Sequence, residues 1–115
     1  MKEYLLVYRA DYETYPNIRR SPEEMQAITQ KWMNWAAGIA AQGKLADRGN
    51  SLVSDGRVLK SNGSFSDGPY TEIKESIMGY SLVKASSIEE ATELANGCPI
   101  LLVGGSVEIR EIRAI

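Results

Sequence analysis

The sequence contains no histidine. Imidazole is the side chain that titrates nearest neutral pH, and it is a common ligand of zinc and of haem iron. Its absence excludes Ser–His–Asp and Cys–His catalytic arrangements, because both need an imidazole. The spacing of the acidic residues does not indicate a site for a hard cation either. We therefore expect no metal and no other cofactor.

Cysteine is nearly absent as well. Cys98 is the only one, and an intrachain disulfide is therefore excluded. Cys98 precedes Pro99 at the end of an expected helix, where no feature lowers a thiol pKa, so we interpret it as structural. No apolar run has the length that a membrane span needs, and the first residues lack the apolar core of a signal peptide. We expect a cytoplasmic protein without membrane contact.

Positive charge is sparse. Lysine and arginine total 13 against 15 acidic residues, which gives a formal net charge of −2 and argues against nucleic-acid binding. The hydrophobic fraction of 43% and the charged fraction of 24% are ordinary for a soluble globular protein. With 115 residues and no linker or repeat, the sequence predicts a single domain over residues 1–115.

Two helices are expected from their starting signals and periodicity. Ser21, Pro22 and Glu24 suit the N-cap, N1 and N3 positions of a capping box. The helix that follows carries apolar residues at helical spacing as far as Gly43, and Gly38 within it indicates close packing. A second helix is expected after Ser86-Ser87 and ends at Asn96-Gly97.

The principal strands are expected at residues 4–9, 77–85 and 106–112, which are short and rich in apolar or alternating residues. In the second of these, Met78, Tyr80 and Leu82 mark the favoured face.

The middle of the chain carries weaker signals. A ragged strand is expected within residues 45–54, and Asp55-Gly56 predicts a hairpin turn to a return strand at 57–60. After a second turn at Asn62-Gly63, residues 64–66 predict a short strand.

The order of these elements favours an α+β fold with a split βαβ arrangement, an antiparallel sheet and both helices on one face. The other face of the sheet would then expose Tyr, Leu and Val side chains. We therefore predict a homodimer in which two such sheets pack together.

The segment from Ser66 to Glu75 holds the main candidate for chemistry. Pro69 stiffens this loop, which presents the carboxylate of Asp67. That carboxylate either caps its own turn or faces a cleft, where it would act as an acid, a base or a hydrogen-bond acceptor.

Six further residues are candidates for a ligand site: Arg9, Trp32, Tyr70, Glu72, Lys74 and Tyr80. The aromatic residues either fill the core or form a pocket wall, and Trp32 and Trp35 are neighbours on the first helix. The charged residues are either solvated or, for Arg9 and Lys74, anchors for an anionic group.

The run from Asp67 to Glu75, followed by Gly79-Tyr80, resembles the signature of the DGPF group of YCII-related proteins. The resemblance extends to Cys98-Pro99 and to the run from Val107 to Arg110. It implies a ferredoxin-like βαββαβ fold of the dimeric α/β-barrel superfamily and a homodimer.

The broader family includes an enzyme that acts on chlorinated hydroquinones, for which a His–Asp pair is proposed, and related domains are fused to sigma factors of the extracytoplasmic-function type. Asp67 matches the acidic member of that pair, but this chain has no histidine, and Tyr70 stands where the signature has Phe. Two functions are therefore expected. The first is small-molecule binding in a cleft near Asp67, with or without acid–base catalysis. The alternative is a non-enzymatic interaction or regulatory module.

Overall fold

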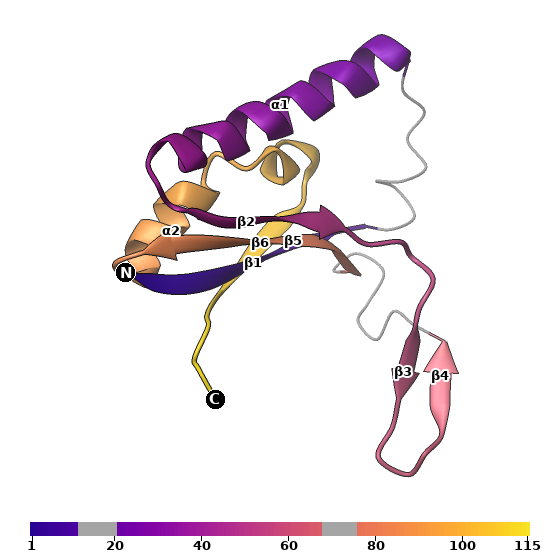
Figure 1. Ribbon diagram of the computed structural model, residues 1–115. Helices are drawn as coiled ribbons and strands as arrows, with labels where there is room; N and C mark the ends of the chain where they lie inside the picture. Colours follow the sequence, from indigo (N-terminus) through magenta and orange to yellow (C-terminus); the bar gives the residue numbers. More distant parts are fainter. Residues whose placement is uncertain (12–20, 68–75) are drawn as a thin grey trace.

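A four-stranded antiparallel sheet carries two helices on one of its faces (Figure 1). The computed structural model describes residues 1–11, 21–67 and 76–115. The sheet has the strand order β2-β5-β1-β6, and its strands are β1 (Lys2–Ala10), β2 (Leu45–Ser51), β5 (Ser76–Ala85) and β6 (Ser106–Glu111). The helices are α1 (Pro22–Ala41) and α2 (Ile88–Ala95). The predicted α+β, ferredoxin-like arrangement with helices on one face is confirmed.

Strand β1 lies at the centre of the sheet, between β5 and β6. Its residues Tyr4, Leu6, Tyr8 and Ala10 are buried beneath the helices, while the residues between them are only partly buried. This alternation is the strand period of two. The core is therefore built on the helix-covered face of the sheet.

Helix α1 begins where its capping box predicts. The Ser21 hydroxyl accepts a hydrogen bond from the Glu24 backbone N–H at 3.1 Å, and Glu24 Oε1 accepts one from the Ser21 N–H at 3.3 Å. At the other end, Gly43 takes a φ of +70°, which suits a glycine after a helix. Ile39 is buried, and Trp32 and Trp35 pack against the core.

Helix α2 begins at the predicted cap, where the Ser87 hydroxyl accepts the Glu90 backbone N–H. Ala91 and Ala95 give it a buried face of small side chains. The Trp35 indole N–H donates to the Leu94 carbonyl at 2.9 Å and so ties α1 to α2. A short 3₁₀ helix, η2 (Pro99–Val103), follows. No helix in the described ranges is long and apolar enough to cross a membrane.

The predicted hairpin at Asp55-Gly56 is wrong. Strand β2 pairs with β5, whereas β3 (Arg57–Leu59) pairs with β4 (Phe65–Asp67) around Asn62-Gly63. The β3–β4 hairpin projects from the main sheet, on the side away from the helices (Figure 1). The reason is that β5 offers β2 a ten-residue edge over a packed core, and cross-strand contacts there outweigh the local turn preference.

The alternation predicted in β5 separates its two faces by side-chain size. The helix-covered face carries Ser81, Val83 and Ala85, whereas Tyr80 and Leu82 are only partly buried. The helices cover the face with small side chains because large ones would hold them away from the sheet. Close packing was expected at Gly38, yet no described atom would lie within 4 Å of an added Cβ there.

Glycine is required at position 49. Gly49 takes a φ of +74°, and a Cβ there would overlap the backbone carbonyl of Tyr80 on the neighbouring strand. The register of β2 against β5 shifts around this residue, as at a β-bulge that needs a left-handed glycine. We predict that Gly49→Ala lowers the free energy of unfolding by about 3 kcal/mol or more.

The matched control is Gly38→Ala, which adds the same methyl group to the interior of α1. We expect this variant to raise the free energy of unfolding by about 1 kcal/mol, since alanine is the better helix former and the added Cβ has space. Urea denaturation followed by circular dichroism measures both. Equal stability of the two variants would contradict the structure of β2.

Candidate functional site

A pocket of about 410 Å³ lies on the helix-covered face of the sheet, between α1 and the β2–β5 side. One wall comes from α1 and the other from the two strands, and β1 and η2 each contribute one residue. The lining is mainly apolar and aromatic. Its described members are Tyr8, Thr29, Trp32, Met33, Trp35, Ala36, Leu45, Arg48, Gly49, Asn50, Ser51, Leu52, Met78, Gly79, Tyr80, Ser81 and Ile100.

Three aromatic rings form the inner wall of this pocket. Tyr8 and Trp32 lie with their ring centroids 5.0 Å apart, and Trp32 and Trp35 lie 5.9 Å apart. Tyr8 also contacts Trp35 at 6.1 Å, and all three pairs meet edge to face. Edge-to-face contacts hold each ring in one orientation. The wall is therefore a fixed surface against which a flat molecule can pack.

The Tyr8 hydroxyl starts a chain of buried hydrogen bonds. It donates to Ser81 Oγ at 2.5 Å, and Ser81 Oγ donates to the Arg48 carbonyl at 2.5 Å. Burial raises the pKa of the Tyr8 hydroxyl well above its usual range, although the bond to Ser81 acts in the opposite direction. The Tyr8 hydroxyl therefore links β1 to β2 through Ser81.

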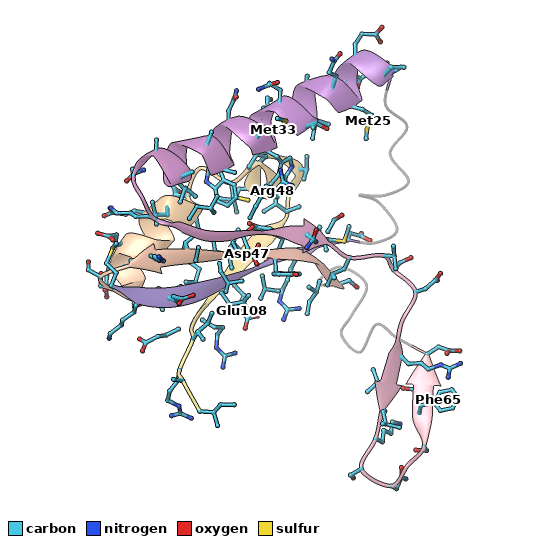
Figure 2. All side chains as sticks on the ribbon, viewed as in Figure 1. Met25, Met33, Asp47, Arg48, Phe65 and Glu108 are labelled. Carbon is cyan, nitrogen blue, oxygen red and sulfur yellow. The ribbon has the colours of Figure 1, made fainter. Side chains whose placement is uncertain are left out.

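The β2 side of the pocket is polar and carries one cation. Arg48 extends from β2 toward α1, whereas Glu108 lies on the opposite side of the sheet (Figure 2). The Asp47 carboxylate accepts the Gly49 backbone N–H at 2.7 Å and shapes the bulge beside Arg48. Among the described lining residues, Arg48 is the only one with a charge at neutral pH, and none is a carboxylate.

The comparisons with known proteins bear on this site. The family model of the YCII-related domain matches residues 1–115.

The chain belongs to the YCII-related family.

No curated protein matches its sequence. A solved structure that it resembles is 5-chloro-2-hydroxyhydroquinone dehydrochlorinase from Burkholderia phenoliruptrix AC1100, in complex with 2,5-dihydroxybenzoquinone. The identity is 16%, the match covers 97% of this chain and 95% of that chain, and the TM-score is 0.43. A likeness at this level assigns neither a substrate nor a mechanism.

The structure of this YCII-related protein brings two of the predicted site residues to one pocket. Trp32 contributes its ring, and Tyr80 borders the pocket from β5. The register sets Tyr80 opposite Val7 and Asn50, and Asn50 Nδ2 donates to the Tyr80 hydroxyl at 3.4 Å. The Tyr80 ring thus lies on the face opposite the buried Ser81.

The other predicted residues lie elsewhere. Arg9 forms a salt bridge with Glu108 at 3.0 Å and is not among the lining residues. Asp67 ends β4 and borders a separate hollow with Asp55, Gly56 and Arg57. Its predicted catalytic role stays a prediction. The remaining three, Tyr70, Glu72 and Lys74, lie outside the described residues.

Sequence reasoning missed Arg48 and its strand as part of a site. The available signal was the composition of β2, whose residues Leu45–Ser51 include only two apolar side chains. A strand so polar, separated by three residues from the helix with both tryptophans, is suited to an open rim rather than to a core. The side on which Arg48 lies depends on the bulge at Gly49, which the sequence does not reveal.

Cys98 is 1% exposed, and its predicted structural role agrees with this burial. Burial raises the pKa of the thiol to about 11, although a hydrogen bond from the Ile100 backbone opposes the shift. Cys98 therefore holds far less thiolate near neutral pH than an ordinary cysteine does.

We predict that Cys98 in the folded protein reacts with a disulfide reagent at about pH 8 at least roughly 100-fold more slowly than a free cysteine does. Denaturing guanidinium chloride should restore the ordinary rate. The unfolded chain loses the thiol proton first, so the contribution of Cys98 to stability is complete below about pH 8.5 and declines as the pH rises. Fast labelling of the folded protein would show that Cys98 is accessible.

Proposed function

We propose that this YCII-related protein binds a small planar organic molecule in the pocket between α1 and the β2–β5 side of the sheet. The observation that carries the proposal is the aromatic wall of Tyr8, Trp32 and Trp35. This wall faces the polar strand β2 across a pocket whose volume is about 410 Å³. Ligand pockets typically span about 300–1,000 Å³ and combine an apolar lining with a few placed polar groups. A molecule of one or two rings fits this space.

The proposal concerns binding, because the described lining offers no group suited to proton transfer. The chain has no imidazole, no carboxylate is among the described lining residues, and Tyr8 holds its proton. Acid–base catalysis by Asp67 is a further step, for which Asp67 would need a substrate at the hollow beside Arg57. Ligand binding at the aromatic wall does not require catalysis by Asp67.

The test uses a helix residue that lines the pocket and a neighbour that does not. We predict that Ala36→Leu fills the pocket and weakens binding of 2-naphthol at least roughly tenfold, since the added atoms occupy ligand space. The signals of the two indole N–H groups, from Trp32 and Trp35, report binding in a nuclear magnetic resonance titration. In the wild-type protein, 2-naphthol should shift both indole signals.

Ala37→Leu is the control, because Ala37 is exposed, adjacent in the chain and absent from the lining. It should bind 2-naphthol as wild type does. If the indole signals of wild type do not respond to 2-naphthol or to any other planar probe, the proposed function is wrong.

We also propose that two copies assemble through the open face of the sheet, which supports the second candidate function of an interaction module. Leu5 pairs in register with Leu82, and Val7 pairs with Tyr80, and all four are partly exposed on that face. These side chains form an apolar centre on a surface that no described element covers.

The charges beside this centre favour a second copy as the partner. Glu108 lies between Arg9 and Arg110 and forms salt bridges with both. A face that carries both signs can meet a copy of itself across a two-fold axis without net repulsion. The projecting β3–β4 hairpin lies on this same side of the sheet and exposes Leu59 and Phe65 (Figure 1). It would extend along a partner that packs on the open face.

The wild-type protein should therefore have twice the 12.7 kDa mass of one chain in solution. We predict that Leu82→Arg converts it to a monomer, because a buried unpaired charge at an interface costs several kcal/mol. Ala37→Arg, on the exposed side of α1, is the control and should keep the wild-type mass. Light scattering after size exclusion measures the mass. A monomeric wild type at about micromolar concentration would refute the assembly.

A further inference from the structure

We infer that the pocket selects planar ligands that carry an anionic group, and that Arg48 binds that group. This inference rests on the proposed function, because it names the chemical class that the same pocket accepts. It starts from the distribution of charge in the lining. Sixteen of the described lining residues are uncharged at neutral pH, and the remaining one is Arg48. A pocket with one cation and no described anion is electrostatically biased toward negative ligands.

Arg48 is distinct from the cations that have carboxylate partners. Arg9 and Arg110 both pair with Glu108, Lys2 pairs with Glu111, and Lys44 pairs with Glu90. Within the part of the chain that the structure describes, no carboxylate lies within 4.0 Å of the Arg48 guanidinium. Among the described residues, its five N–H donors therefore have no carboxylate partner that would compete with a ligand. The side chain is exposed and also lines the pocket, so a ligand in the pocket can reach it from solvent.

The backbone that carries Arg48 is fixed on both sides. Its carbonyl accepts the bond from the buried Ser81 hydroxyl, which is held in turn by Tyr8. The residue after it is Gly49, whose φ of +74° and bond from its N–H to Asp47 set the bulge. These contacts direct Arg48 toward α1 (Figure 2). The Arg48 guanidinium is thus carried by a segment of β2 that hydrogen bonds hold in place beside the aromatic wall.

The shape of the two recognition elements defines the ligand class. The aromatic wall accepts a flat ring, and the guanidinium matches two oxygens that lie in one plane. Thr29 and Ser51 also line the pocket, and their hydroxyl groups are of a kind that donates to an anion. An aromatic carboxylate satisfies all these features at once, with its ring on the wall and its carboxylate at Arg48. A neutral amide of the same shape cannot form a salt bridge with Arg48.

The experiment compares matched ligands that differ only in charge: benzoate with benzamide, and 2-naphthoate with 2-naphthamide. Wild type should bind each carboxylate at least roughly tenfold more tightly than its amide, since charge-assisted bonds are stronger than neutral ones. Arg48→Met should remove this preference by weakening carboxylate binding while leaving amide binding within about twofold. Arg48→Lys should keep part of it, because the charge remains and the planar fork is lost. The indole signals of Trp32 and Trp35 and calorimetry measure affinity.

Arg113→Met is the control variant, because it removes the same charge from the exposed C-terminal segment. It should retain the full preference for carboxylates, which separates the local role of Arg48 from the net charge of the protein.

The outcomes distinguish this inference from the proposed function. If carboxylate and amide bind wild type equally, or if Arg48→Met weakens both alike, the pocket binds planar molecules but the role of Arg48 is wrong. If neither pair of ligands shifts the indole signals of wild type but 2-naphthol does, the proposed function stands and the inference about Arg48 is wrong. If 2-naphthol and other planar probes also give no shift, both proposals fail. Circular dichroism of Arg48→Met verifies that the variant is folded.

Discussion

The buried hydroxyl of Tyr8 is the constraint on which the rest of the site depends. A buried hydroxyl must find a hydrogen-bond partner, because leaving it unsatisfied costs about 1–3 kcal/mol. Ser81 Oγ is that partner, and it donates its own hydrogen bond to the Arg48 carbonyl. Three strands are joined by this short chain of bonds. The ring of the same tyrosine contacts Trp32 and Trp35 and so locates α1 above the sheet.

The two faces of the sheet carry side chains of different size, as β5 shows. Toward the helices it presents Ser81, Val83 and Ala85, which are small enough for α1 and α2 to pack closely. On the other face it presents Tyr80 and Leu82, which are large and only partly buried. The helix-covered face therefore forms the core and the pocket, while the open face retains apolar area that a monomer leaves in contact with water.

The pocket shows how a chain without histidine can still contain a chemically specific site. In the binding mode that we propose, the aromatic wall supplies the binding energy and the guanidinium of Arg48, beside the bulge at Gly49, supplies the selectivity. Neither element needs a group that titrates near neutral pH. Membership of the YCII-related family is established for this chain. The chain has no histidine for a His–Asp pair, and the role that we propose for Arg48 is recognition of an anion rather than proton transfer.

Much of the fold was predictable from the sequence. The capping box at Ser21 and Glu24 marks the start of α1 because its two hydrogen bonds are local. The three-residue spacing of Trp32 and Trp35 predicts a shared helix surface, and both rings indeed pack together. The lack of histidine excluded whole classes of catalysis. Such conclusions follow from local bonds, periodicity and composition.

Tertiary structure alone decided which partner β2 takes, which face of β5 is buried and where Arg48 lies. Asp55-Gly56 is a favourable turn, but β2 pairs with the ten-residue edge of β5, whose other edge pairs with β1. The direction of Arg48 depends on the bulge at Gly49, where only glycine fits because the carbonyl of Tyr80 lies where a Cβ would be. These outcomes depend on contacts between residues about thirty positions apart, and local preference contains no information about them.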